Sequence, residues 1–113
     1  MNIIMMTEGL TVKEKYALSY NQGINKMSDH VGERITIDKF MMYEDEDEDG
    51  IRTILSILAE NGQVYATNSP TFIRDFTRIV EMFTADDEEL PEILIYGGTS
   101  KNDREFIACS VAM

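Results

Sequence analysis

Two cations stand in a run of turn-forming residues near the end of the chain. The segment from 97 to 104 reads GGTSKNDR, with Lys101 and Arg104 as its basic residues. A loop with flexible glycines, hydroxyl donors and two cations can wrap around phosphate groups. The Walker spacing is missing, and the following residues have the pattern of a strand rather than a helix. We therefore expect contact with a nucleic-acid backbone, not binding of a nucleoside triphosphate.

Binding of single-stranded nucleic acid also needs aromatic rings on which bases stack, and more cations along the backbone. The further candidate cations are Lys39 and Arg52. The candidate stacking residues are Tyr43, Tyr65 and Tyr96, with Phe106 as a less favoured fourth. For each tyrosine, a half-buried position with the hydroxyl in water is an equally good interpretation.

Metal-binding chemistry is disfavoured by the pattern of the acids. Asp45, Asp47 and Asp49, followed by Gly50, resemble the start of a calcium loop. The twelfth position of such a loop is Ser56 rather than a bidentate glutamate, and the flanks have the pattern of strands. We expect no metal and no cofactor.

Catalysis is disfavoured by the scarcity of reactive groups. His30 is the only histidine, and Cys109 is the only cysteine. Cys109 alternates with Ile107 and Val111, which is typical of a small core residue in a strand. No nucleophile, base and orienting group can be assembled from these residues, so the sequence predicts a protein that is not an enzyme.

The net charge of −11 over 113 residues has the wrong sign for a phosphate-binding protein. Ten of the 21 acids, however, lie in two blocks at 44–49 and 86–89. The remaining eleven acids nearly balance ten lysines and arginines, which leaves room for a local positive groove. We expect both blocks to be solvated loops, available to a protein partner.

The elements that must position these residues follow the order β-β-β-α-β-β. Strand-like patterns cover 33–43, 51–59 and 63–67, with the hairpin dipeptide Asn61-Gly62 before the third. A helix begins at Asn68-Ser69-Pro70 and carries an apolar stripe, and strands at 93–96 and 105–112 close the chain. This order predicts an OB-like five-stranded barrel over residues 33–113.

The first 32 residues are expected to form an N-terminal helical arm. Thr11 and Glu14 have the capping-box spacing, which predicts a helix from Val12 to about Tyr20. A single cysteine excludes an internal disulfide. We see neither a signal-peptide pattern nor a membrane-length apolar run, and we expect a cytoplasmic location. A homo-oligomer is an open alternative, with Met5, Met6, Met41 and Met42 covering the interface.

From Thr53 to Phe106 the chain resembles small phage single-stranded DNA-binding proteins. The matching pieces are Thr53-Ile54, the segment 61–65, Ser69 before Thr71, and Gly98-Thr99-Ser100-Lys101. The pattern is similar to that of Bacillus phages with protein-primed replication. The resemblance implies an OB-fold protein that coats single-stranded DNA in replication or recombination, in the cytoplasm of a bacterial host. It implies tyrosine stacking, with Tyr65 at the matching position.

Two functions therefore stand as expectations. The first is sequence-independent binding of single-stranded DNA by a phage-encoded protein. The alternative is an acidic DNA mimic, whose acid blocks occupy the basic groove of a host nucleic-acid-binding protein. The acidic block at 44–49 departs from the phage pattern and supports the alternative.

Overall fold

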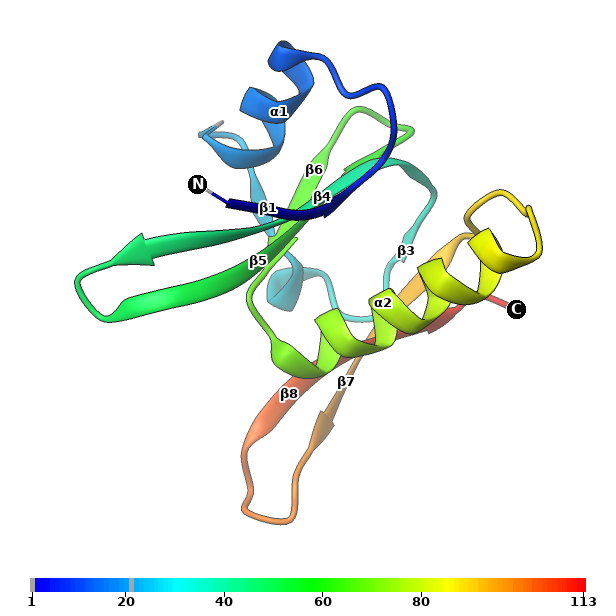
Figure 1. Cartoon of the computed structure of the whole chain (residues 1–113). Coiled ribbons are helices and arrows are strands. Elements are labelled where there is room, and N and C mark those ends of the chain that lie inside the picture. The colour runs from blue at the N-terminus through cyan, green and yellow to red at the C-terminus, as the bar shows by residue number, and fades with distance from the viewer. Residues whose placement is uncertain (1, 21) are drawn as a thin grey trace.

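The computed structural model describes residues 2–20 and 22–113, and it is mainly β with two helices (Figure 1). The elements, in chain order, are β1 (Asn2–Met6), α1 (Val12–Ser19), β2 (Asn25–Lys26), the short 3-10 helix η1 (Met27–His30), β3 (Arg34–Ile35), β4 (Ile37–Asp47), β5 (Gly50–Ala59), β6 (Val64–Thr67), α2 (Pro70–Ala85), β7 (Ile93–Thr99) and β8 (Glu105–Val111). The mainly β class is thus confirmed. No described helix is long and apolar enough to cross a membrane.

The strands form two sheets, and the chain passes from one sheet to the other between β3 and β4. The larger sheet has the order β1-β4-β5-β6-β2, and the smaller has the order β3-β7-β8. Only Thr36 separates β3, which pairs with β7, from β4, which pairs with β5. The described strands do not close into a barrel, because no strand of the larger sheet pairs with a strand of the smaller one. The predicted element order from residue 33 onward is nevertheless present.

The turn between β5 and β6 follows the expectation from its Asn-Gly pair. Gly62 has a φ of +87°, a value that a residue with a side chain rarely adopts. The side-chain oxygen of Asn61 accepts a hydrogen bond from the Gln63 amide at 2.9 Å. The turn sets the antiparallel register in which Ile57 faces Tyr65.

The first acidic block is not the loop that the sequence predicted. Residues 44–47 continue β4, and only Glu48 and Asp49 form the turn before β5. Pairing with β5 extends the strand, since Glu44 faces Thr53 and Asp45 faces Arg52. Residues 46–50 at this end of the hairpin are exposed, so the carboxylates there remain solvated within the strand pair. We call residues 44–52 the acidic ribbon. The second block, 86–89, lies in an exposed turn, as expected.

The N-terminal segment contains more than the expected helical arm. The helix α1 is confirmed, and its capping box is formed: the Thr11 amide donates to Glu14 at 3.0 Å, and the Glu14 amide donates to Thr11 at 3.1 Å. The strands β1 and β2, however, pair with β4 and β6 and so belong to the larger sheet. Five apolar or neutral residues are too few for their periodicity to predict β1.

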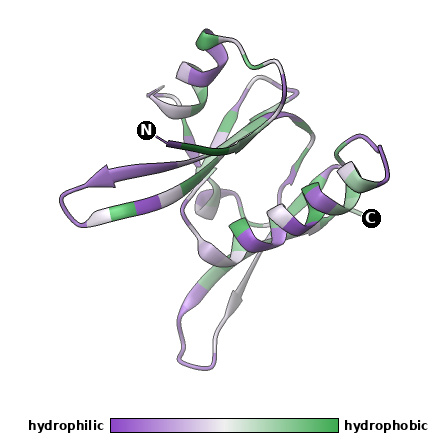
Figure 2. Ribbon diagram, in the orientation of Figure 1, coloured by the Kyte–Doolittle hydropathy of each residue, from purple (hydrophilic) through white to green (hydrophobic). Residues whose placement is uncertain are grey.

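The core lies on both faces of the larger sheet. One cluster packs the apolar stripe of α2, including Phe72 and Phe76, against residues of both sheets, such as Leu55 of β5 and Cys109 of β8. The stripe is visible along α2 in Figure 2. A smaller cluster on the other face holds α1 to the sheet through Leu18. The prediction of core positions is confirmed for Phe72, Phe76 and Cys109, while Phe83 is partly buried against the same cluster.

Candidate nucleic-acid interface

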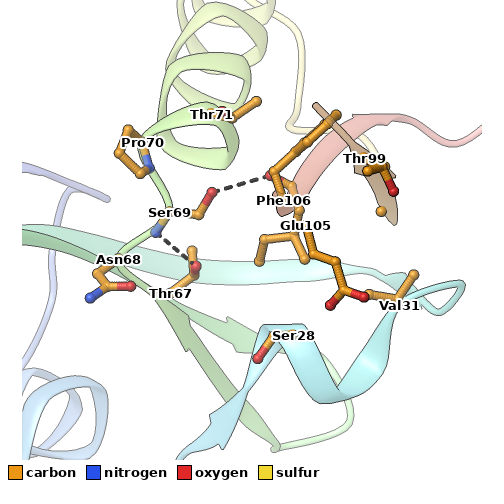
Figure 3. Close-up of a pocket in the computed structure, with 13 residues that line it drawn as sticks. Ser28, Val31, Thr67, Asn68, Ser69, Pro70, Thr71, Thr99, Glu105 and Phe106 are labelled. Atoms are coloured by element: carbon orange, nitrogen blue, oxygen red, sulfur yellow. Dashed lines mark hydrogen bonds between the residues drawn. The ribbon is translucent and has the colours of Figure 1, made fainter. Parts of the chain in front are cut away.

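A groove of about 780 Å³ lies where the two sheets fail to join (Figure 3). Its walls come from η1, from the junction of β6 with α2, and from the β7–β8 hairpin. We call it the hairpin groove. The lining residues are mostly small, hydroxyl-bearing or amide-bearing: Ser28, Val31, Thr67, Asn68, Ser69, Pro70, Thr71, Gly97, Gly98, Thr99, Glu105, Phe106 and Ile107.

Ser69 ties the two walls of the hairpin groove together. Its hydroxyl donates to the carbonyl oxygen of Ile107 at 3.1 Å and accepts from the Phe72 amide at 3.3 Å. Its own amide donates to the Thr67 hydroxyl at 3.0 Å. One side chain thus caps α2 and fastens that helix to β8 across the gap between the sheets. The start of α2 consequently borders the groove, where its dipole favours negative charge.

An aromatic ring forms part of the opposite wall. Phe106 faces Gly98 across the β7–β8 pair, and a Cβ atom at Gly98 would lie 2.6 Å from the Phe106 ring. The glycine therefore provides the space that the ring occupies. Tyr96 is on the same face of the hairpin, diagonal to Phe106, and is 40% exposed. These two rings can stack on bases.

The cations predicted in the last loop lie at the tip of the same hairpin. Lys101 and Arg104 are exposed, and neither forms an ion pair with another residue in the part of the chain that the structure describes. The turn is closed by the Ser100 amide, which donates to the Arg104 carbonyl at 2.8 Å. Acids are also present, because Asp103 is in the turn and Glu105 lines the groove. The local charge is therefore close to neutral rather than strongly positive.

Lys39 and Arg52 are engaged with acids elsewhere. Lys39 forms an ion pair with Glu14 of α1, and the pair lowers the pKa of Glu14 to about 2. Hydrogen bonding to the same carboxylate raises the pKa of Lys39. Arg52 forms an ion pair with Asp47 within the acidic ribbon at 2.9 Å. The structure does not bring these two cations to the hairpin groove.

Two of the three predicted stacking tyrosines are buried. Tyr43 is 5% exposed beneath α1, and burial, with the charge of Asp45, raises its pKa. Tyr65 is 8% exposed, and its ring makes an edge-on contact with His30 at a centroid distance of 5.1 Å. Neither ring offers a face to a base in this arrangement. Of the tyrosines predicted to stack, Tyr96 alone is exposed.

The acidic ribbon and the hairpin groove are on different parts of the molecule. Figure 1 shows the β4–β5 hairpin and the β7–β8 hairpin projecting from the body in different directions. The carboxylates at 44–49 therefore do not cover Lys101 and Arg104. This separation removes the simplest electrostatic objection to a nucleic-acid strand at the hairpin.

Sequence reasoning did not find the β6–α2 side of the groove. Asn68 and Ser69 were predicted as a helix start, and Ser69 before Thr71 as part of the resemblance, but their distance from the 97–107 segment along the chain conceals the contact. Among the described residues, no group of three potential metal ligands is present. The imidazole of His30 pairs with the carboxylate of Glu33 at 2.6 Å. Burial raises the pKa of Cys109 to about 12, which disfavours the reactive thiolate.

Comparison of the chain with protein-family models, with curated proteins and with solved structures gave no match.

Proposed function

We propose that this chain binds single-stranded DNA without sequence preference along the hairpin groove. The observation that carries the proposal is that one hairpin holds the exposed ring of Tyr96, the partly buried ring of Phe106, and the cations Lys101 and Arg104, which form no ion pair with any residue that the structure describes. Stacking rings and backbone cations are the two elements of sequence-tolerant single-strand binding. We propose no enzymatic activity.

An OB-like architecture is the fold that we infer for this function. The support is that one bent strand, β3–β4, takes part in both sheets, and that a helix connects the third and fourth strands of the predicted order. In OB-folds the hairpin of the last two strands commonly contributes to nucleic-acid binding. The gap between the two sheets would be an unclosed barrel seam, and Ser69 and Cys109 each form a side-chain hydrogen bond between α2 and β8 beside it.

A single strand suits this surface better than a duplex. A ring can stack only on a base whose face is free, and paired bases inside a duplex offer none. The hydroxyl and amide groups of Thr67, Asn68 and Thr71 can serve as hydrogen-bond donors to phosphates or base edges without selecting a sequence. Coating of phage DNA in replication or recombination is the role that the resemblance implies.

The test is fluorescence anisotropy of a labelled dT oligonucleotide in a salt series. We expect saturable binding that weakens with salt and that duplex DNA does not compete away. Tyr96→Ala and Phe106→Ala should each lose roughly 1–3 kcal/mol if each ring stacks on one base. Tyr16→Ala is the matched control, because Tyr16 is a 61% exposed tyrosine on α1. Equal losses in all three variants would place the stacking elsewhere.

A mimic of DNA is the second candidate, supported by the shape of the acidic ribbon. It carries six carboxylates along a projecting hairpin, and Arg52 is the only cation that we find paired within it. Regularly spaced carboxylates can attract the basic groove of a nucleic-acid-binding protein. Replacing Glu44, Glu46 and Glu48 with glutamine would abolish inhibition of such a protein, whereas binding of dT oligonucleotides would remain or strengthen.

A further inference from the structure

The strand β1 is a free edge of the larger sheet. It pairs with β4 on one side, with Asn2 opposite Glu44 and Met6 opposite Met41. In the part of the chain that the structure describes, no strand pairs with its other side. A free edge displays amides and carbonyls that another extended strand can bind, and monomeric proteins usually protect such an edge with charges, prolines or a short strand.

Charges and prolines are absent from β1, which has five residues and one irregularity in its pairing with β4, between Ile3 and Met5. Its sequence is NIIMM, without charge or proline, and Ile3, Ile4 and Met6 are 37%, 48% and 39% exposed. Figure 2 shows this strand in hydrophobic colours at the base of the β4–β5 hairpin, away from the hydrophilic tip of the acidic ribbon. Because β1 itself carries no charge, two copies of a chain of net charge −11 can approach along it with less repulsion than along the acidic ribbon.

A groove lined by apolar side chains and by three glutamates continues from this edge onto α2. The groove has a volume of about 620 Å³, and its walls include Met5 and Met6 of the β1 strand, Phe40 of β4, and Val80 of α2. Methionine side chains adapt to irregular contact surfaces. A strand that pairs with β1 could therefore bury its apolar side chains in this groove.

Other edges of the sheets are less suited to strand addition. The strands β2 and β3 have two residues each. The strand β8 begins at Glu105 and is tied to Ser69 through Ile107. The best complement for an uncharged five-residue edge is therefore the same edge of another molecule, because antiparallel pairing about a two-fold axis is self-complementary.

We propose that two copies of this chain form a symmetric dimer by antiparallel pairing of their β1 strands. The two five-stranded sheets become one continuous sheet, with Ile4 at the middle of each β1 strand near the two-fold axis. The proposal does not depend on nucleic-acid binding, since β1 is on a different part of the chain from the β7–β8 hairpin.

The test is sedimentation equilibrium of the full chain without nucleic acid, over a range of micromolar concentrations. We expect a dimer of twice the 12.9-kDa chain mass. Ile4→Lys should raise the dimer dissociation constant roughly 100-fold, because each copy loses a buried isoleucine and two lysines approach each other. Ile51→Lys is the matched control: Ile51 is a 68% exposed isoleucine on β5, and its substitution should leave the dimer intact.

Hydrogen exchange gives an independent readout of the same pairing. Amides of β1 should be more protected in the native dimer than in Ile4→Lys, while amides of β5 should be unchanged. Circular dichroism shows whether Ile4→Lys remains folded, and Ile3→Lys provides a second variant of the edge if it does not. A monomer across the concentration range, or a dimer that both lysine variants of β1 leave intact, would overturn the proposal.

Discussion

Ser69 is the residue whose removal tests the link between the two sheets most sharply. Ser69→Ala removes the cap of α2, which typically stabilises a protein by about 1 kcal/mol. It also removes the hydrogen bond to Ile107, worth roughly 0.5–1.5 kcal/mol. We therefore expect a loss of about 1.5–2.5 kcal/mol in the free energy of unfolding.

Ser69→Asp separates the two contributions. Aspartate is a good helix cap, but an ionised carboxylate cannot donate to the Ile107 carbonyl. Urea unfolding monitored by circular dichroism should thus show both variants destabilised, with the aspartate variant retaining the cap. Ser28→Ala, at an exposed serine of the same groove, is the control and should change stability by less than about 0.5 kcal/mol. A stability of Ser69→Ala equal to that of the control would refute the bridging role.

Three further predictions concern other sites. Gly98→Ala should displace the Phe106 ring and destabilise the protein by about 1–3 kcal/mol in urea unfolding, an effect that Phe106→Ala in the same chain should relieve. The pKa of Glu14 is lowered to about 2 in the fold, so the stability that its pair with Lys39 contributes is present above the ordinary glutamate pKa and is lost as the pH falls toward 2. The melting temperature of Glu14→Gln should therefore fall less than that of the unmodified protein between pH 6 and pH 2. Cys109 should react with a thiol reagent much more slowly in the native protein than in urea, because it is 4% exposed and burial raises its pKa to about 12; equal labelling rates in the two conditions would contradict this.

The sequence predicted the elements whose determinants are local. The helix α1 has its capping box, α2 has its stripe and its serine cap, and the turn at Gly62 has its Asn-Gly pair. Each of these patterns is complete within a few residues. The order of strands and helix from residue 33 onward followed from them.

Features that depend on distant partners could not be predicted. The strand β4 extends through Asp47 only because β5 pairs with it, and β1 is a strand only because β4 is beside it. The burial of Tyr43 depends on α1, and that of Tyr65 on the core. The same limit applies to the groove, where Ser69 and Ile107 are 38 positions apart. Lys101, Arg104 and Tyr96 were found because exposure on a hairpin needs no distant partner.

The most direct test of the proposed function is the salt dependence of dT-oligonucleotide binding in the double variant Lys101→Glu, Arg104→Glu. Loss of two phosphate contacts should reduce the slope of log K against log salt by about 1.4, since single strands contribute about 0.7 per contact. The control Lys13→Glu, Arg78→Glu makes the same change in net charge at exposed cations on α1 and α2. We predict a reduced slope and weak binding in the hairpin variant alone. Equal slopes in the two variants, or no binding by the unmodified protein at low salt, would contradict binding at the hairpin groove.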